Sequence, residues 1–145
     1  MKNLLGNTIR AAGLLLGVAI GAPATAEPLT LDNPSQMNGL DVVCTGVGSG
    51  KDDPRWTSYP VRIEFANGAA QNLSGAHVAL TKHGASVADF ECPGAWVLVN
   101  GDRGNYHVAA TIVGSDARPV SASFVLGKGG QKRIILRFKD FQANQ

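Results

Sequence analysis

From residue 59 onward, hydrophobic and polar residues alternate along the chain in short runs that are separated by glycine-rich turns. The first regular run, Y-P-V-R-I-E-F-A, places Val61, Ile63 and Phe65 on one face, with Arg62 and Glu64 on the other. Side chains alternate between the two faces of a strand, so this run predicts a half-buried strand with one face toward a core.

The same period of two recurs in several later runs. Strands are expected at 41–48, 59–66, 76–81, 86–92, 95–100, 105–112, 120–126 and 132–138. Seven or eight short strands at a spacing of about ten residues predict an all-β fold, an antiparallel Greek-key β-sandwich. The residues expected to face its core on the later runs are Val78, Leu80, Tyr106, Val108, Ala110, Ile112, Val120, Ala122, Phe124, Leu126, Ile134, Leu136 and Phe138.

The stretch 90–108 joins a strand end, a Pro-Gly turn, an apolar strand that carries Trp96, and a glycine-rich turn into the next strand. The apolar run, A-W-V-L-V-N, is hydrophobic on both faces, which is typical of a central strand in a sandwich. We therefore expect Trp96 to be largely buried between the two sheets. Its expected neighbours, each on the inward phase of its own strand, are Phe65, Leu80, Tyr106, Phe124 and Leu136.

Residues 48–58 form a polar segment without a strand or helix period, which predicts a loop. Its charged side chains surround one large aromatic residue, and tryptophan and arginine often anchor interfaces. Loops on a rigid scaffold concentrate binding residues, so this loop is a candidate partner-binding surface. The alternative is that its aromatic side chains fold back as a lid over an open end of the sandwich. The residues of this candidate site are Lys51, Asp52, Asp53, Arg55, Trp56 and Tyr59.

The N-terminal segment has the three parts of a secretory signal peptide. Lys2 and Arg10 form a basic start, residues 11–22 are apolar or glycine, and A-T-A at the end of the segment is a small-residue cleavage site. An apolar stretch of about a dozen residues is shorter than the roughly 20 that span a bilayer, so cleavage after Ala26 is expected rather than membrane insertion. The predicted location is the periplasm or the exterior.

Cleavage leaves 119 of the 145 residues, which is enough for one domain with a core. Residues 27–38 contain two prolines and no sustained period, so they are expected to form an N-terminal tether or a short edge segment. The β-sandwich domain is expected to span 39–141, and 142–145 form a C-terminal tail.

Charge argues against two classes of partner. The chain has 13 basic and 11 acidic residues, and loss of Lys2 and Arg10 with the signal peptide makes the two counts equal. A neutral chain does not attract nucleic acid or an anionic membrane, so neither is expected as a partner. The basic residues near the C-terminus are expected on a solvated strand face and in turns rather than in a binding patch; they are Lys128, Lys132, Arg133, Arg137 and Lys139.

The chain contains two cysteines, Cys44 and Cys92, each at the edge of an expected strand. Disulfides form in oxidising compartments, and an exported chain with two cysteines therefore predicts a Cys44–Cys92 disulfide. Two free buried thiols are the alternative.

No motif in the sequence predicts catalytic, metal-binding or cofactor-binding residues. The run T-G-V-G-S-G-K is similar to a phosphate-binding loop, but Thr45 stands where that motif needs glycine, and Asp52 where it needs serine or threonine. His77 and His107 lie on separate expected strands and His83 lies in a turn, so the three histidines lack the spacing of metal ligands.

Several runs along the chain carry a resemblance to a known family: G-V-G, D-D-P-R, Y-P-V-R-I-E-F-A, A-H-V-A-L-T, P-G-A-W-V-L-V, G-N-Y-H-V and G-G-Q-K-R-I-I-L-R-F. With these runs, the chain from Gly46 onward resembles small exported bacterial proteins described as carboxypeptidase regulatory-like. The step from Gly104 through Tyr106 to Val108 is similar to a motif of transthyretin-like sandwiches, with G-D-R-G in place of their usual L-P-P-G. The resemblance implies a transthyretin/prealbumin-like fold in the periplasm and an accessory role without catalytic residues.

The expected function is therefore that of a non-enzymatic exported domain that binds or supports another component of the cell envelope. The alternative is a small periplasmic hydrolase on the same fold. The enzyme with a transthyretin-like fold, 5-hydroxyisourate hydrolase, ends in Y-R-G-S, whereas this chain ends in R-F-K-D-F-Q-A-N-Q. A histidine brought together with aspartate or serine by the fold would favour the hydrolase.

Overall fold

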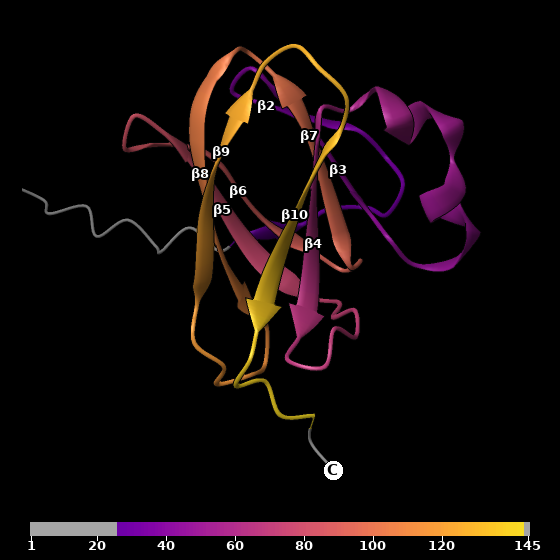
Figure 1. The fold of residues 1–145 in the computed structure, drawn as a ribbon, viewed down its shortest axis with the longest axis vertical. Helices are drawn as coiled ribbons and strands as arrows, with labels where there is room; N and C mark the ends of the chain where they lie inside the picture. The colour runs from indigo at the N-terminus through magenta and orange to yellow at the C-terminus, as the bar shows by residue number, and fades with distance from the viewer. Residues whose placement is uncertain (1–25, 144–145) are drawn as a thin grey trace, which may run out of the picture.

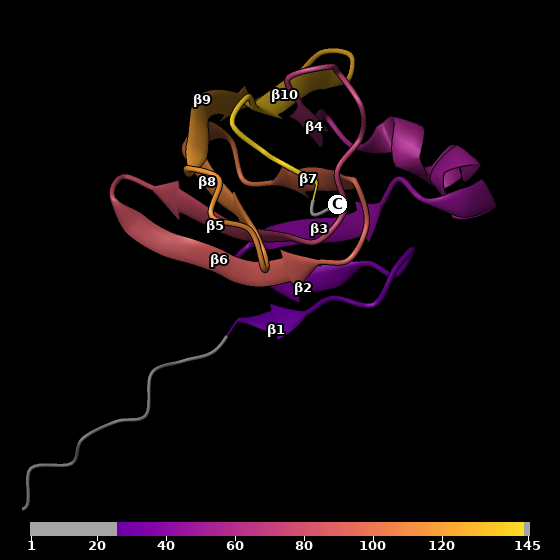
Figure 2. The ribbon, with the colours of Figure 1, turned by 90° about the horizontal axis from the view of Figure 1, so that it is seen from below.

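The computed structural model describes residues 26–143, which form two five-stranded sheets packed face to face (Figures 1 and 2). We name each sheet after its central strand. The β5 sheet contains, in spatial order, β1 (Glu27–Pro28), β6 (Ala85–Cys92), β5 (Ala76–Lys82), β8 (Gly104–Ile112) and β9 (Val120–Leu126). The β7 sheet contains β10 (Lys132–Phe138), β4 (Val61–Asn67), β7 (Trp96–Gly101), β3 (Leu40–Thr45) and β2 (Ser35–Met37). The predicted all-β sandwich is confirmed.

The alternating runs build the core because each strand directs every second side chain toward the opposite sheet. Apart from Trp96, all residues that the pattern placed inward are buried or packed against one continuous core. Val61, Ile63 and Phe65 of β4 are fully buried, and they face inward as predicted. β7 is the central strand of its sheet, as its two apolar faces predicted.

Strand direction departs from the prediction at two sheet edges, because the sandwich is not purely antiparallel. β10 runs parallel to β4, from Lys132 beside Val61 to Phe138 beside Asn67, and β1 runs parallel to β6. The short connection 127–131 carries the chain from β9 in one sheet to β10 in the other instead of closing a paired hairpin. The chain therefore enters the β7 sheet alongside β4, and in the same direction.

The N-terminal segment 27–38 supplies β1 and β2, which are edge strands of the two sheets. These two strands bring the number among residues 26–143 to ten, above the seven or eight expected. Residues 1–25 of the expected signal peptide lie outside the described residues. In the part of the chain that the structure describes, no helix is long and apolar enough to cross a membrane.

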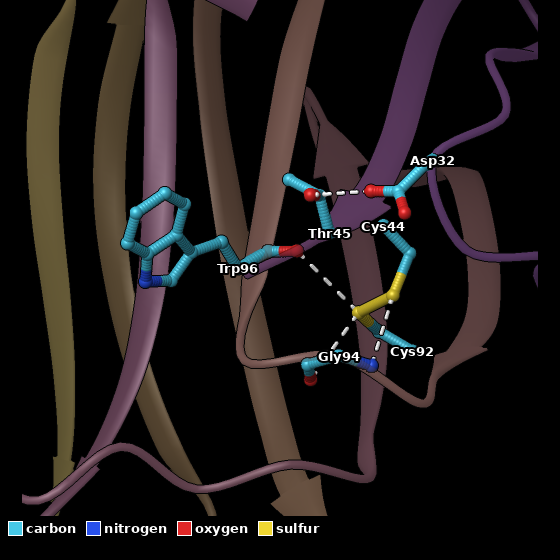
Figure 3. The surroundings of a disulfide bond; sticks show 6 residues. All are labelled: Asp32, Cys44, Thr45, Cys92, Gly94 and Trp96. Carbon is cyan, nitrogen blue, oxygen red and sulfur yellow. Dashed lines mark hydrogen bonds between the residues drawn. A yellow bond between two sulfur atoms is a disulfide. The ribbon is translucent and has the colours of Figure 1, made fainter. Parts of the chain in front are cut away.

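Cys44 of β3 and Cys92 of β6 form a disulfide that joins the two sheets through the core (Figure 3). Their Cα atoms are 5.5 Å apart, and both residues are fully buried. The predicted pairing is therefore confirmed. Closing a loop with a sequence separation of 48 stabilises the fold by about 4 kcal/mol in the chain-entropy account.

Trp96 does not lie between the sheets, and that prediction is wrong. The inward positions of β7 are Val97 and Val99, which stand beside Ile63 and Val61 of β4. The Trp96 ring points away from the disulfide, while its carbonyl oxygen faces the Cys92 sulfur (Figure 3). A shift of one residue reverses the face of every side chain on a strand, and β7 is apolar at both phases, so its hydrophobic pattern could not determine which face is inward.

Candidate functional site

A second, smaller apolar cluster lies on the outer face of the β7 sheet. Val43 of β3 and Leu98 of β7 point outward there. Trp56 and Tyr59, from the segment between β3 and β4, cover them. The loop 48–58 consists of two short 3-10 turns, η1 (Gly48–Asp52) and η2 (Pro54–Ser58), which lie outside this sheet (Figures 1 and 2). Four buried residues thus fix the loop against the sheet.

Asp53 sets the conformation of the second turn. Its carboxylate accepts hydrogen bonds from the Arg55 backbone N–H at 2.9 Å and from the Arg55 side chain at 2.8 and 3.0 Å. Pro54, with its fixed φ, begins the turn. The hydrogen bonds from the Arg55 side chain and backbone lower the pKa of the Asp53 carboxyl, so it stays ionised and engaged with Arg55.

Trp56 is the anchor of the loop and is only 4 % exposed. Its indole Nε1 donates to the Gly50 carbonyl at 2.7 Å, and the Arg55 guanidinium lies over its ring at 4.7 Å. Trp56 is therefore covered by the loop and the sheet rather than exposed to solvent. The lid alternative is right about burial, but the lid covers the outer face of a sheet rather than an open end of the sandwich.

Tyr59 packs edge-to-face on Trp56, with ring centroids 5.9 Å apart. Its hydroxyl donates to Asp41 Oδ2 at 3.0 Å. Burial, and then this hydrogen bond, raise the pKa of Tyr59 to about 12, because both favour the neutral phenol. Tyr59 thus connects the loop to β3 through a partly buried hydrogen bond.

Two further contacts hold the loop from its sides. Gln131 Nε2 donates to the carbonyls of Trp56 and Tyr59 at 2.9 and 3.1 Å, which ties η2 to the connection before β10. At the other side, Gly50 lies against the Asp32 carboxylate so closely that a Cβ would stand 2.1 Å from Asp32 Oδ2. A side chain at position 50 would have to displace the Asp32 carboxylate, which also accepts a hydrogen bond from Thr45 at 2.6 Å.

Beside the apolar cluster, the same face holds a group of charged side chains. Glu64 is only 3 % exposed, and Arg133 reaches it through two hydrogen bonds, of which Nη2 to Oε1 measures 3.2 Å. Arg62 Nη2 lies 3.5 Å from Glu64 Oε2, and its guanidinium stacks 4.4 Å from the centre of the Trp96 ring. A Cβ at Gly46 would stand 2.7 Å from Trp96 Cγ, so glycine there makes room for the ring.

A hollow of about 150 Å³, which we call the loop pocket, lies between the loop and this charged face. Two of its wall residues carry buried N–H groups that have no hydrogen-bond partner among residues 26–143: Arg62 Nε and Trp96 Nε1. A buried donor without an acceptor costs about 1–3 kcal/mol. Both nitrogens are covered by the protein, so neither opens into the hollow. The pocket is lined by residues 51–54, Trp56, Thr57, Arg62, Trp96, Leu98 and Gln131.

The structure brings part of the predicted site together. Lys51, Asp52, Asp53 and Trp56 line the loop pocket, whereas Arg55 stacks on the outside of Trp56 and Tyr59 lies beneath it. The sheet residues Arg62, Trp96 and Leu98, and Gln131 from a distant turn, were not predicted as site residues. One feature of the sequence points to them: β7 is apolar on its outward face, which indicates that this face is covered.

The outer face of the β5 sheet holds the histidine pairs that could favour a hydrolase. His107 Nδ1 lies 3.3 Å from Ser123 Oγ, and His77 Nε2 lies 2.5 Å from Asp89 Oδ1. His107 stands beside Thr81, four positions from His77 on β5. At about 3.3 Å per residue, the two pairs are about 13 Å apart and do not form one Ser-His-Asp cluster.

A wider hollow of about 470 Å³ lies on that face, beside the turn that contains His83. His107, Ser123 and Val125 line it and are exposed to solvent. Neither of the two apolar clusters found in residues 26–143 covers it from outside. Within the same residues, no three His, Cys, Asp or Glu side chains are grouped to hold a metal ion.

Comparison with known proteins adds no assignment to this geometry. A scan against protein-family models finds no match for the chain, and a search of curated proteins finds none either. The interpretation of the site therefore depends on its own contacts and charges.

Proposed function

We propose that the protein is a non-enzymatic exported domain that binds a protein of the cell envelope through the loop pocket. The observation that carries this proposal is the loop pocket itself, which combines the charged side chains of Lys51, Asp52 and Arg62 with apolar walls from Trp56 and Leu98. Hollows with apolar walls and a few convergent polar groups are typical of binding sites.

The chemistry around the pocket supports binding rather than catalysis. The Thr57 hydroxyl donates to the Pro54 carbonyl at 2.9 Å, so it is not aligned with a base. Asp53 is engaged by Arg55, and its lowered pKa makes it a weak proton acceptor at neutral pH. Recognition of a partner uses the same groups without requiring a proton transfer.

A transthyretin/prealbumin-like domain of the carboxypeptidase regulatory-like kind is the finer part of the proposal. Its support is the resemblance in the runs from Gly46 onward, together with the way Tyr106 opens β8. The Tyr106 hydroxyl donates to the Asp102 carbonyl at 2.7 Å and thereby fixes the turn before the strand. The periplasmic location is supported by the N-terminal signal pattern and agrees with the buried disulfide.

Site-specific photo-cross-linking in the native cell envelope tests the proposal. A benzophenone amino acid at Thr57, on the rim of the loop pocket, is expected to give a discrete adduct with one envelope protein. The matched control carries the same group at Ser121, which is exposed on β9 of the β5 sheet, and is expected to give none. Adducts from Ser121 alone, or a Thr57 adduct that persists in Arg62→Gln and Trp96→Phe proteins, would contradict it.

The hydrolase is a second candidate because His107 and Ser123 are within hydrogen-bonding distance. Each is exposed, and the nearest histidine–carboxylate pair lies too far away to orient the imidazole. We expect Ser123→Ala to leave any ester or amide hydrolysis by the purified protein unchanged. Loss of a measurable activity in this variant, with the fold intact, would favour the hydrolase instead.

A further inference from the structure

We infer that copies of this chain associate head to tail, with the side of the sandwich that carries β9 and β10 in one copy against the side that carries β1 and β6 in the next. The inference goes beyond the proposed function, because none of the residues that line the loop pocket belongs to these four strands. It follows from the distribution of charge, from the order of the strands and from the exposed apolar residues.

The charged residues are segregated along the chain. Residues 117–139, which include β9, β10 and the connection between them, contain six basic residues and no acidic residue. The rest of the described chain holds all 11 acidic residues and only five basic ones, so the neutral total conceals two regions of opposite sign. The six basic residues are all exposed; they are Arg118, Lys128, Lys132, Arg133, Arg137 and Lys139.

The order of the strands puts the opposite charges on opposite sides of the sandwich. β9 and β10 are edge strands of the two sheets and lie on the same side, which we call the basic edge and which is at the top of Figure 2. β1 and β6, at the far edge of the β5 sheet, form the acidic edge at the bottom of that view. These two strands contain no lysine or arginine, and their acidic residues are Glu27, Asp89 and Glu91.

A hollow of about 240 Å³ lies on the basic edge, between the start of β9 and the end of β10. Its charged lining residues are Arg118, Arg137, Lys139 and Asp140. Asp140 is engaged by Arg118, whose backbone N–H donates to it at 3.1 Å and whose Nε lies 3.5 Å away. Arg137 and Lys139 make no ion pair within residues 26–143, so this hollow presents two cations to an anionic group from outside.

The three large apolar residues that are exposed among residues 26–143 also lie toward the basic edge. Val113 is in the connection before β9, Val125 is on β9 and Ile135 is on β10. Arginine together with apolar side chains is typical of contacts between polypeptides, whereas binding to nucleic acid depends mainly on charge. The surface that fits this edge is therefore an acidic surface of a polypeptide.

The acidic edge of a second copy is such a surface. Glu27 and Glu91 make no ion pair within the described residues, and Asp89 has only His77 as a charge partner there. Opposite charges on two different surfaces of identical chains favour a heterologous contact, which joins copies in a row instead of closing a pair. The loop pocket of each copy stays outside the contact, so a row presents several such pockets to the envelope.

Analytical ultracentrifugation of the exported protein at two salt concentrations tests the inference. At about 0.01 M salt, where charges act over about 30 Å, the average mass is expected to rise with protein concentration. At about 1 M salt, where charges act over about 3 Å, the mass is expected to remain that of one chain. The mass of a single chain under both conditions would overturn the inference, and so would association that does not weaken with salt.

Neutral substitutions separate the two edges. The basic-edge variant carries Arg137→Gln and Lys139→Gln, and the acidic-edge variant carries Asp89→Asn and Glu91→Gln. Each is expected to associate about tenfold or more weakly at low salt, with an unchanged circular dichroism spectrum. The control is Arg103→Gln, an exposed arginine between β7 and β8, which is expected to associate as the unmodified chain does. Equal association of the control and either edge variant would contradict the inference.

A mixture of the two edge variants tests the head-to-tail arrangement. The mixture has one intact basic edge on one variant and one intact acidic edge on the other, so complexes of two chains and no larger are expected. No complex in the mixture, or complexes of more than two chains, would overturn the arrangement. Binding of a purely monomeric chain to DNA or to vesicles of anionic lipid, lost in the basic-edge variant, would assign the basic edge to a polyanion instead of a second copy.

Discussion

On the outer face of the β7 sheet, a loop buries Trp56 and Tyr59 against Val43 and Leu98, and Glu64 is almost fully covered. The outer face of the β5 sheet has no such cover in the described chain, and its strands present small and polar side chains. These include Ala79, Thr81, Ala109, Thr111, Ser121 and Ser123.

A sandwich needs apolar residues only on the faces that meet, and the β5 sheet follows this rule. The β7 sheet departs from it, with an extra apolar cluster, a buried carboxylate and two unpaired donors. The core of the sandwich does not require these features, and the unpaired donors oppose folding. The comparison therefore places the specialised surface on the β7 sheet, in and around the loop pocket.

The largest expected difference between the two faces comes from removing the Trp56 side chain on one and the Ser123 hydroxyl on the other. Trp56→Ala is expected to lower the free energy of unfolding by about 3–5 kcal/mol, because it opens a cavity over Val43 and Leu98. Ser123→Ala on the β5 sheet is expected to change it by less than about 0.5 kcal/mol. Urea unfolding followed by circular dichroism measures both, and equal effects would mean that the loop does not pack as described.

Charge gives the second difference. Glu64→Ala removes the buried partner of Arg133 and Arg62, and is expected to cost about 2 kcal/mol because two cations lose their acceptor. Asp89→Ala breaks an exposed pair with His77 and is expected to cost less than about 1 kcal/mol. Chemical denaturation at low salt compares the two variants. A larger loss of stability for Asp89→Ala than for Glu64→Ala would show that the buried Glu64 is not the more important carboxylate for the fold.

The stability that the covered face contributes depends on pH, because Tyr59 is part of this face. At pH 7, Tyr59→Phe is expected to cost about 1–2 kcal/mol, since it leaves both Asp41 oxygens without a donor. The folded pKa of about 12 lies above the ordinary value of 10.0. The contribution of the neutral phenol is therefore fully present below pH 10 and is lost as the pH rises toward about 12, so that the advantage over Tyr59→Phe disappears.

Unfolding measured between pH 8 and pH 12 tests this dependence. The stability of the unmodified protein is expected to fall toward that of Tyr59→Phe over the upper two pH units. A gap between the two proteins that stays constant up to pH 12 would show that Tyr59 ionises as in the unfolded chain.

The sequence predicted the strands well where polar and apolar residues alternate. On β4, β5, β8, β9 and β10 the large apolar residues lie mainly at one phase, so the inward face follows from the period of two. On β7 both phases are apolar, and the larger side chain, Trp96, was placed inward. The structure places the smaller Val97 and Val99 there, because their partners across the sheet are the inward residues of β4 and β3.

The candidate site was predicted in part for a similar reason. Local composition identified the loop and its charged residues around Trp56, but it carries no information on which sheet face the loop covers. Arg62 and Gln131 enter the site only through long-range packing, since β4 and the turn before β10 are distant in sequence. The parallel pairing of β10 with β4 likewise depends on the chain passing from one sheet to the other between β9 and β10. No local sequence pattern predicts this connection.

The most direct test of the central claim, that the covered face holds a binding pocket, is Trp96→Phe measured for both stability and partner cross-linking. The substitution keeps the ring beside Arg62 and removes a buried N–H without an acceptor in the described chain. The free energy of unfolding is expected to stay the same or to rise by about 1 kcal/mol, while the Thr57 cross-link is lost. A clear loss of stability with the cross-link intact would show instead that Trp96 supports the fold and not a partner.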